Sequence, residues 1–115
     1  MKSAGRKKLK PAVFLDRDGT LILDKGYLSD PKQVRYFSST PEALRLLKKA
    51  GYLLIVVTNQ SGVARGYYGE KDIQRVHHQI KSDLLKLGVA PHAYFYCRHY
   101  PAGKVKSLGQ TCACR

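Results

Sequence analysis

The sequence alternates short β-prone runs with amphipathic segments, and this alternation restricts its fold more than any other feature. Strands are predicted over residues 12–16, 52–57 and 93–96, and apolar residues at helical spacing predict helices over 40–50 and 70–87. The unbroken apolar character of 52–57 is typical of a central parallel strand that is buried on both faces. Strand, helix, strand, helix, strand is the order of a right-handed parallel α/β sheet.

The boundaries of these elements have signals of their own. Thr40 is expected to cap the first helix, with a proline directly after it. Gly51 and Gly88 are expected to terminate the two helices. Residues 19–39 show no clean periodicity and are interrupted by glycine and Asp-Pro, so they are predicted to form a long loop with a small hairpin.

Two carboxylates, Asp16 and Asp18, follow the first predicted strand in the run Asp-Arg-Asp-Gly-Thr. If the backbone stayed extended, residues two apart would point to the same side and both carboxylates would face one site. A divalent cation relieves the repulsion between two such groups, and Mg²⁺ favours one or two carboxylates together with water and phosphate. One carboxylate could also attack phosphorus. An acidic turn selected only for its backbone conformation is the alternative interpretation.

In parallel α/β sheets, ligands bind beyond the carboxyl ends of the strands. Asp16 and Asp18, Thr58 and Asn59, and Cys97 would all lie at that edge. The hydroxyl, amide and backbone N–H groups of residues 58–62 are suitable donors to phosphate oxygens. Arg65, between glycines just beyond them, could clamp a second anionic group or be an exposed loop arginine, and its chemistry alone does not decide.

The three cysteines all lie near the carboxyl terminus and, with one histidine, form a complete tetrahedral zinc set: Cys97, His99, Cys112 and Cys114. Four protein ligands would make this a structural site, because a catalytic zinc keeps one position open. The C-x-C spacing is tighter than that of common zinc fingers, and unligated thiols with a surface histidine are the alternative. The other histidines, His77, His78 and His92, are expected on a helix surface or in loops.

The composition is that of a single small globular domain, with 115 residues and 43% hydrophobic content. No apolar stretch is long enough to cross a bilayer, and the amino terminus lacks the apolar segment of a secretory signal, so a cytoplasmic protein is expected. The chain is also expected to be a monomer. The net charge of +13 would suit a protein that binds nucleic acid, but five of the 21 basic residues lie in the first ten positions. Residues 1–11 are therefore predicted to be a basic disordered tail, and a nucleic-acid partner is not expected.

Three motifs carry a resemblance to a known family: residues 14–20, residues 56–62, and the cysteine–histidine set between 97 and 114. Together they resemble phosphatases of the haloacid dehalogenase (HAD) superfamily. Within these, the chain looks like the D,D-heptose 1,7-bisphosphate phosphatases, with histidinol-phosphate phosphatases as close relatives. The resemblance covers residues 12–115. It implies a HAD-like Rossmannoid three-layer sandwich with a central parallel sheet and with the zinc-binding loop at 97–114.

The resemblance also implies a mechanism, a sugar-phosphate substrate and two metals. Asp16 would be the nucleophile, and Asp18 would be the general acid and then the general base. Mg²⁺ would be held by the Asp16 carboxylate and the Asp18 backbone carbonyl, while Zn²⁺ would brace a specificity loop. The phosphoryl group would be removed from position 7 of the sugar bisphosphate through an aspartyl-phosphate. The residues implied for substrate binding are Thr58, Asn59, Gln60, Arg65 and Arg115.

The sequence departs from the family pattern at its carboxyl end, where it stops at Arg115. The family continues with a lysine beside the nucleophile and with later strands, one of which carries an acidic residue for magnesium. Because this sequence stops before both, we expect the 115-residue chain to lack the later strands and to turn over substrate poorly. Two other interpretations remain. One is a zinc-stabilised, non-enzymatic module that binds nucleic acid, and the other is a histidinol-phosphate or nucleic-acid 3′-phosphatase.

Overall fold

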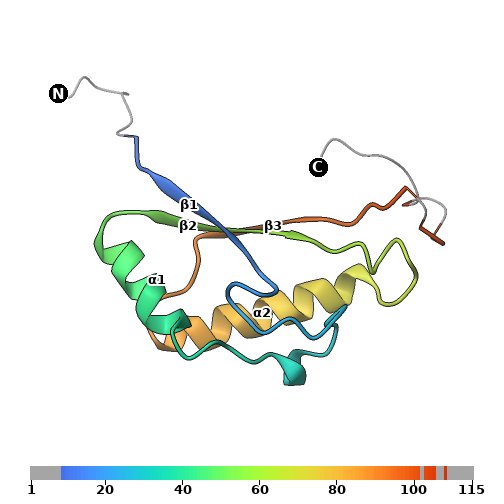
Figure 1. Cartoon of the computed structure of the whole chain (residues 1–115), viewed down its shortest axis with the longest axis horizontal. Coiled ribbons are helices and arrows are strands. Elements are labelled where there is room, and N and C mark those ends of the chain that lie inside the picture. The colour runs from blue at the N-terminus through green and yellow to red at the C-terminus, as the bar shows by residue number, and fades with distance from the viewer. Residues whose placement is uncertain (1–8, 102, 106–107, 109–115) are drawn as a thin grey trace.

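The structure is a computed structural model, and it describes residues 9–101, 103–105 and 108. The strands and helices follow one another in the predicted order (Figure 1). Their bounds are β1 (Ala12–Asp16), a short 3₁₀ helix η1 (Pro31–Gln33), α1 (Thr40–Lys49), β2 (Leu53–Asn59), α2 (Glu70–Lys86) and β3 (Ala93–Cys97). The predicted strands and helices are thus confirmed to within two residues at each end.

The three strands form one parallel sheet in the order β1-β2-β3, with β2 in the centre. Both crossovers step in the same direction along the sheet, and right-handed crossovers of this kind place their helices on the same face. Figure 1 shows α1 and α2 on one side of the sheet. The α/β fold with a parallel sheet is therefore confirmed, and the described residues supply two layers of the expected sandwich.

The core lies between the sheet and the two helices. Alternate residues of β2 point into it, with Leu54 and Val56 fully buried. Helix α2 meets them with a stripe of buried side chains spaced three or four residues apart, from Ile73 to Leu84. The opposite face of the sheet is open in the described part of the chain, where Phe14 and Phe95 are 67% and 61% exposed.

The helix boundaries agree with the sequence except at the start of α1. Gly51 and Gly88 follow the helices with φ of 92° and 73°, the left-handed conformation that ends a helix. Thr40 is the first helical residue, whereas Ser39 holds the N-cap position without a side-chain cap bond. The Thr40 hydroxyl instead donates to the Leu21 carbonyl at 2.8 Å. The predicted cap was wrong because this buried hydroxyl ties the long loop to α1.

The packing of the core predicts how much stability is lost when a buried side chain of β2 is shortened. Replacing the buried Leu54 with alanine should lower the free energy of unfolding by about 2–5 kcal/mol, because it removes apolar contacts and leaves a cavity. Leu46→Ala on α1 is the matched control, because Leu46 is 58% exposed and its loss should change stability by less than about 0.5 kcal/mol. Urea unfolding of both variants measures the difference, and equal losses would contradict the described core.

Candidate active site

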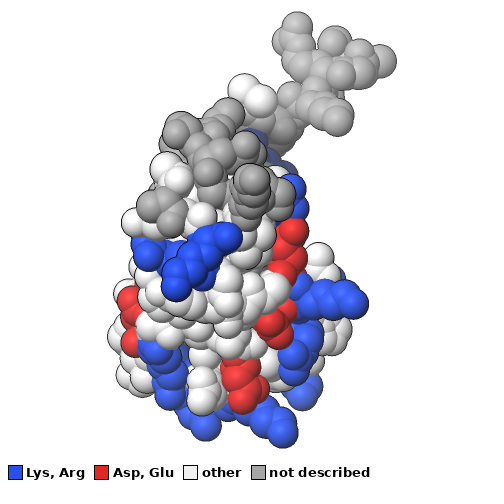
Figure 2. Space-filling view, turned by 90° about the vertical axis from the view of Figure 1, so that its right-hand side faces the viewer, with Lys and Arg blue, Asp and Glu red and all other residues white. Residues whose placement is uncertain are grey.

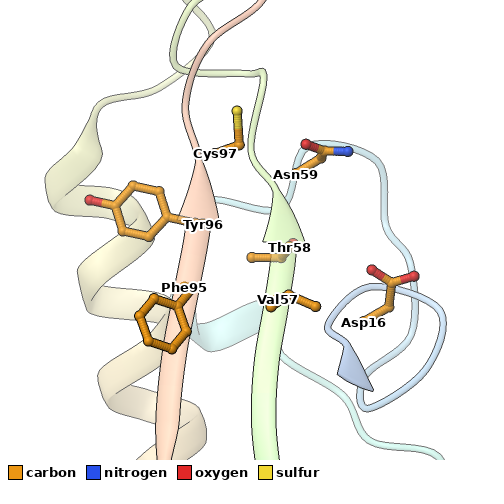
Figure 3. Close-up of a pocket in the computed structure, with 7 residues that line it drawn as sticks. All are labelled: Asp16, Val57, Thr58, Asn59, Phe95, Tyr96 and Cys97. Atoms are coloured by element: carbon orange, nitrogen blue, oxygen red, sulfur yellow. The ribbon is translucent and has the colours of Figure 1, made fainter. Parts of the chain in front are cut away.

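The ends of the three strands bring the predicted polar residues to one edge of the sheet. The parallel register places Asp16 beside Val57 and Asn59 beside Cys97. Figure 3 shows Asp16, Thr58, Asn59 and Cys97 at the ends of the three neighbouring strands. A pocket of about 450 Å³ lies among them, and its walls are Asp16, Val57, Thr58, Asn59, Phe95, Tyr96 and Cys97.

A second pocket of about 370 Å³ lies on the side of the loop that follows β1. It shares Asp16, Thr58 and Asn59 with the first pocket. Its remaining walls are Asp18, Asp24, Gly26, Tyr27 and Ser61. Four of the residues singled out in the sequence, Asp16, Asp18, Thr58 and Asn59, thus border the same cavity.

The backbone brings Asp18 to this cavity by a turn and not by an extended strand. β1 ends at Asp16, and the Arg17 carbonyl accepts the backbone N–H groups of Leu21 and Ile22 at 3.0 and 3.1 Å. The condition considered for the Asp-x-Asp pair, a backbone that stays extended, is therefore not met, because the chain enters a turn at Arg17. The two carboxylates still reach one pocket.

Arg17, between the two aspartates, is a site residue that the sequence did not reveal. Its side chain is 0% exposed, and its Nε and one terminal nitrogen contact the two carboxylate oxygens of Asp18, each at 3.0 Å. A guanidinium matches a carboxylate in this two-point geometry and fixes its orientation. The feature of the sequence that could have indicated this role is the position of Arg17 between two aspartates, where it can pair with a carboxylate.

His77, on helix α2, contacts Arg17 and is buried. The prediction that His77 lies on a helix surface or in a loop was therefore wrong. The remaining terminal nitrogen of Arg17 lies 3.3 Å from His77 Nε2, and the imidazole stacks on Tyr94 with ring centroids 5.0 Å apart. Because a guanidinium only donates, Nε2 must be the acceptor. Burial, with a further effect from the Arg17 charge, lowers the pKa of His77 to about 4. His92 also has a structural partner, since its Nδ1 accepts the Leu54 N–H at 2.9 Å.

Gln60 and Arg65, two of the residues expected to bind substrate, do not line either of the two pockets. Gln60 is 2% exposed, and its amide donates to Thr58 Oγ1 at 2.8 Å and to Asp18 Oδ2 at 3.3 Å. It therefore lies behind Thr58 and lines neither of the two pockets, and direct contact between Gln60 and a substrate stays a prediction. Arg65 lies at the rim, where its Nε donates to Ser61 Oγ at 3.2 Å and its guanidinium lies 3.8 Å from the centre of the Tyr100 ring.

The donor atoms of the second pocket are suited to a hard cation. In residues 9–101, 103–105 and 108 there is no cluster of three or more His, Cys, Asp or Glu side chains that could hold a metal ion. Mg²⁺ does not require such a cluster, because it is commonly bound by one or two carboxylates, with water and phosphate as its other ligands. Asp16 and Asp18 provide that number at this pocket.

Only half of the predicted zinc set can be placed. Cys97 is buried at the end of β3, and His99 follows two residues later. Cys112 and Cys114 lie outside the described residues, as does Arg115, the last residue expected to bind substrate.

Basic and acidic side chains are mixed on the face of the molecule shown in Figure 2, where red patches separate the blue ones. This distribution differs from the continuous basic stripe of many proteins that bind nucleic acid. Among the described residues, no helix is both long enough and apolar enough to cross a membrane.

Comparisons with known proteins identify the class. The sequence profile of the polynucleotide kinase 3 phosphatase family matches residues 11–104. A candidate HAD-like phosphatase from Mesorhizobium loti superposes with a TM-score of 0.85 at 35% identity, over 92% of this chain and 51% of that one. The fold is therefore that of the HAD-like phosphatases.

The chain belongs to the polynucleotide kinase 3 phosphatase family. D-glycero-beta-D-manno-heptose-1,7-bisphosphate 7-phosphatase of Pasteurella multocida is 43% identical over 107 residues, which are 93% of this chain and 58% of the relative. D,D-heptose 1,7-bisphosphate phosphatase from B. bronchiseptica, solved with magnesium and phosphate, superposes with a TM-score of 0.77 at 28% identity, over 91% of this chain and 55% of that one. The chain thus spans little more than half the length of these relatives.

The buried imidazole predicts a pH dependence of stability. His77 has a folded-state pKa of about 4, below its ordinary value near 6.5, so the folded protein binds fewer protons than the unfolded chain between these values. Its contribution is complete above pH 6.5 and is lost as the pH falls toward 4, by roughly 3 kcal/mol at most. Urea unfolding from pH 7 to pH 4 measures the slope.

His77→Gln removes the titrating group but keeps a polar side chain, so this variant should lose much of that slope. His78→Gln is the control, because His78 is exposed on the same helix and should leave the slope unchanged. The same pH slope in wild type and His77→Gln would mean that the imidazole is not held neutral by its surroundings.

Proposed function

We propose that this chain carries the catalytic aspartates of a magnesium-dependent phosphatase that acts on D-glycero-β-D-manno-heptose 1,7-bisphosphate and removes the 7-phosphate. One observation carries the proposal: the carboxylates of Asp16 and Asp18 share a pocket with Thr58 and Asn59. Carboxylates supply a nucleophile and a proton carrier, and the hydroxyl and amide supply donors to phosphoryl oxygens. The names of the relatives support the choice of sugar.

The first chemical step would use both aspartates. A carboxylate oxygen of Asp16 attacks phosphorus, forming an acyl phosphate, while the bond from phosphorus to the sugar oxygen breaks. Asp18, in its acid form, gives its proton to that departing oxygen. Thr58 and Asn59 donate hydrogen bonds to the phosphoryl oxygens and hold the group in line with Asp16.

The second step would release phosphate. Asp18 is now a carboxylate and takes a proton from water, which attacks phosphorus as the bond to the Asp16 oxygen breaks. Arg17 is placed to steady Asp18 in this form, since both carboxylate oxygens accept its N–H groups. Mg²⁺, held at Asp16 and Asp18, would reduce the electrostatic repulsion between the negatively charged carboxylates and the negatively charged phosphate.

Arg65 would serve the far end of the substrate. It lies beyond Ser61 at the rim of the second pocket and carries a charge suited to the distal phosphate of a bisphosphate. Gln60 would orient the Thr58 hydroxyl, to which its amide donates a hydrogen bond. Arg115 stays a candidate for substrate contact because of its position in the sequence.

Zn²⁺ would bind Cys97, His99, Cys112 and Cys114 and stabilise the segment that they enclose. The donor chemistry supports this assignment, because three thiolates and an imidazole suit zinc as the oxygen-lined pocket suits magnesium. The two metals would then have separate roles, one in folding and the other in catalysis.

A nucleic-acid 3′-phosphate is the second candidate substrate. The family's description and the net charge of +13 favour it, while the mixed charges in Figure 2 do not. Histidinol phosphate and a non-enzymatic, zinc-stabilised nucleic-acid module are further alternatives. An enzyme would lose its function on Asp16→Asn, whereas a binding module would not.

Asp16→Asn should reduce magnesium-dependent phosphate release from the heptose bisphosphate by roughly 10³-fold or more, because an amide cannot act as the nucleophile. The assay compares wild type with Asp16→Asn and, as a control, with Asp30→Asn, because Asp30 lies in the long loop and does not line either pocket. A 3′-phosphorylated oligonucleotide is tested in parallel. Retention of the wild-type rate by Asp16→Asn would exclude the proposed mechanism, and the wild-type rate itself tests the expectation of poor turnover.

Cys112→Ser should lower the zinc content below one ion per chain and reduce the melting temperature, because zinc-binding free energy contributes to folding in such sites. Metal analysis of the purified protein and a thermal melt measure the two effects. Ser107→Ala, in the same segment, should change neither. Equal zinc content and melting in wild type and Cys112→Ser would remove the structural zinc from the account.

A further inference from the structure

The Gln60 side chain occupies the space directly behind the candidate phosphate site. Its Nε2 lies 2.8 Å from Thr58 Oγ1 and 3.3 Å from Asp18 Oδ2, and its Oε1 accepts the Tyr68 hydroxyl at 2.6 Å. Gln60 therefore connects three side chains from different parts of the chain. Two of them are residues to which the proposed function gives a chemical role.

These contacts define which way the amide points. With the amide reversed, Oε1 would face the Asp18 carboxylate, and two acceptors would be in contact. In the observed orientation each polar atom of the amide meets a complementary partner. Since Nε2 can only donate, Thr58 Oγ1 accepts from Gln60, and the proton of the Thr58 hydroxyl is left for another acceptor.

Tyr68 is held in place to make its contact with Gln60. A side chain at Gly62 would collide with the Tyr68 ring, so the ring lies directly against the backbone of the loop after β2. Burial raises the pKa of Tyr68 to about 12, so the phenol keeps its proton at ordinary pH and remains a donor. The ring position and the protonation state both favour a constant hydrogen bond to Gln60 Oε1.

We propose that Tyr68 is a positioning residue, which fixes the Gln60 amide so that the Thr58 hydroxyl keeps its proton for a phosphoryl oxygen and Asp18 keeps a donor at Oδ2. This inference rests on the proposed function, because it assigns a role relative to a phosphoryl group at Thr58. Tyr68 itself does not line either of the two pockets and acts through Gln60.

Loss of the Tyr68 hydroxyl would remove the donor that holds Gln60 Oε1. The amide would then be held only by its Nε2 contacts, and the reversed orientation would become more populated although it loses the Asp18 contact. In that orientation the amide presents an acceptor to Thr58. The Thr58 proton would turn toward Gln60, and the phosphoryl oxygen would lose one hydrogen bond. The expected consequence is weaker phosphate binding at an unchanged fold, because phenylalanine preserves the ring against Gly62.

The test is Tyr68→Phe, with Tyr52→Phe as the matched control because Tyr52 directly precedes β2, at the opposite end of that strand from Thr58. In the presence of Mg²⁺, Tyr68→Phe should bind inorganic phosphate about 3- to 10-fold more weakly than wild type, whereas Tyr52→Phe should not change the affinity. The side-chain amide protons of Gln60, followed by NMR without phosphate, should shift and exchange faster only in Tyr68→Phe.

A double-mutant cycle separates positioning from a general structural effect. If Tyr68 acts through Gln60, Tyr68→Phe should change phosphate affinity by less than about twofold in a Gln60→Met background. A full loss in that background would overturn the inference, and so would unchanged affinity and unchanged Gln60 resonances in the single variant.

The outcomes also distinguish this inference from the proposed function. Phosphate release that depends on Asp16 but is insensitive to Tyr68→Phe, with unchanged phosphate affinity, would overturn the inference alone. If wild type with Mg²⁺ binds no phosphate, the proposed function and this inference both fail, whatever the Gln60 resonances show.

Discussion

The parallel pairing of β2 with both of its neighbours is the interaction on which the rest of the structure depends. It aligns three strand ends and so places Asp16, Asn59 and Cys97 at one edge of the sheet. The two crossovers run in the same direction and put both helices on one face, where the buried residues of β2 pack. Packing on that face holds the sheet, and the sheet in turn sets the separation of the polar groups at its edge.

The electrostatics of this edge follow from the short turn after β1. Two carboxylates at one pocket repel each other, and the buried Arg17 reduces this repulsion by pairing with Asp18. A buried guanidinium needs acceptors, and His77 supplies one in its neutral form. On the other side of Asp18, Gln60 adds a donor. Arg17 and Gln60 therefore both have partners behind the pocket, and Asp16, Thr58 and Asn59 line it.

Most of the fold and the front of the site could be predicted from the sequence, because both depend on local pattern. Apolar runs revealed the strands, and polar residues at strand ends revealed Asp16, Asp18, Thr58 and Asn59. The groups behind the pocket were missed for a physical reason: their burial depends on partners far along the chain. His77 lies 60 residues from Arg17, and nothing near either residue in the sequence indicates the contact. The burial of the Gln60 amide against Thr58 and Asp18 was also missed, because a strand-end position does not tell which way a side chain points.

The central claim is that Asp16 accepts a phosphoryl group with the help of magnesium, and beryllium fluoride tests it without requiring turnover. When beryllium trifluoride bonds to a carboxylate oxygen, that oxygen completes a tetrahedral group that resembles a bound phosphoryl group. Fluorine NMR of the protein with beryllium fluoride should show bound resonances that require Mg²⁺ and are absent from Asp16→Asn. The absence of bound fluorine from the wild-type protein, or the same resonances in Asp16→Asn, would contradict the account.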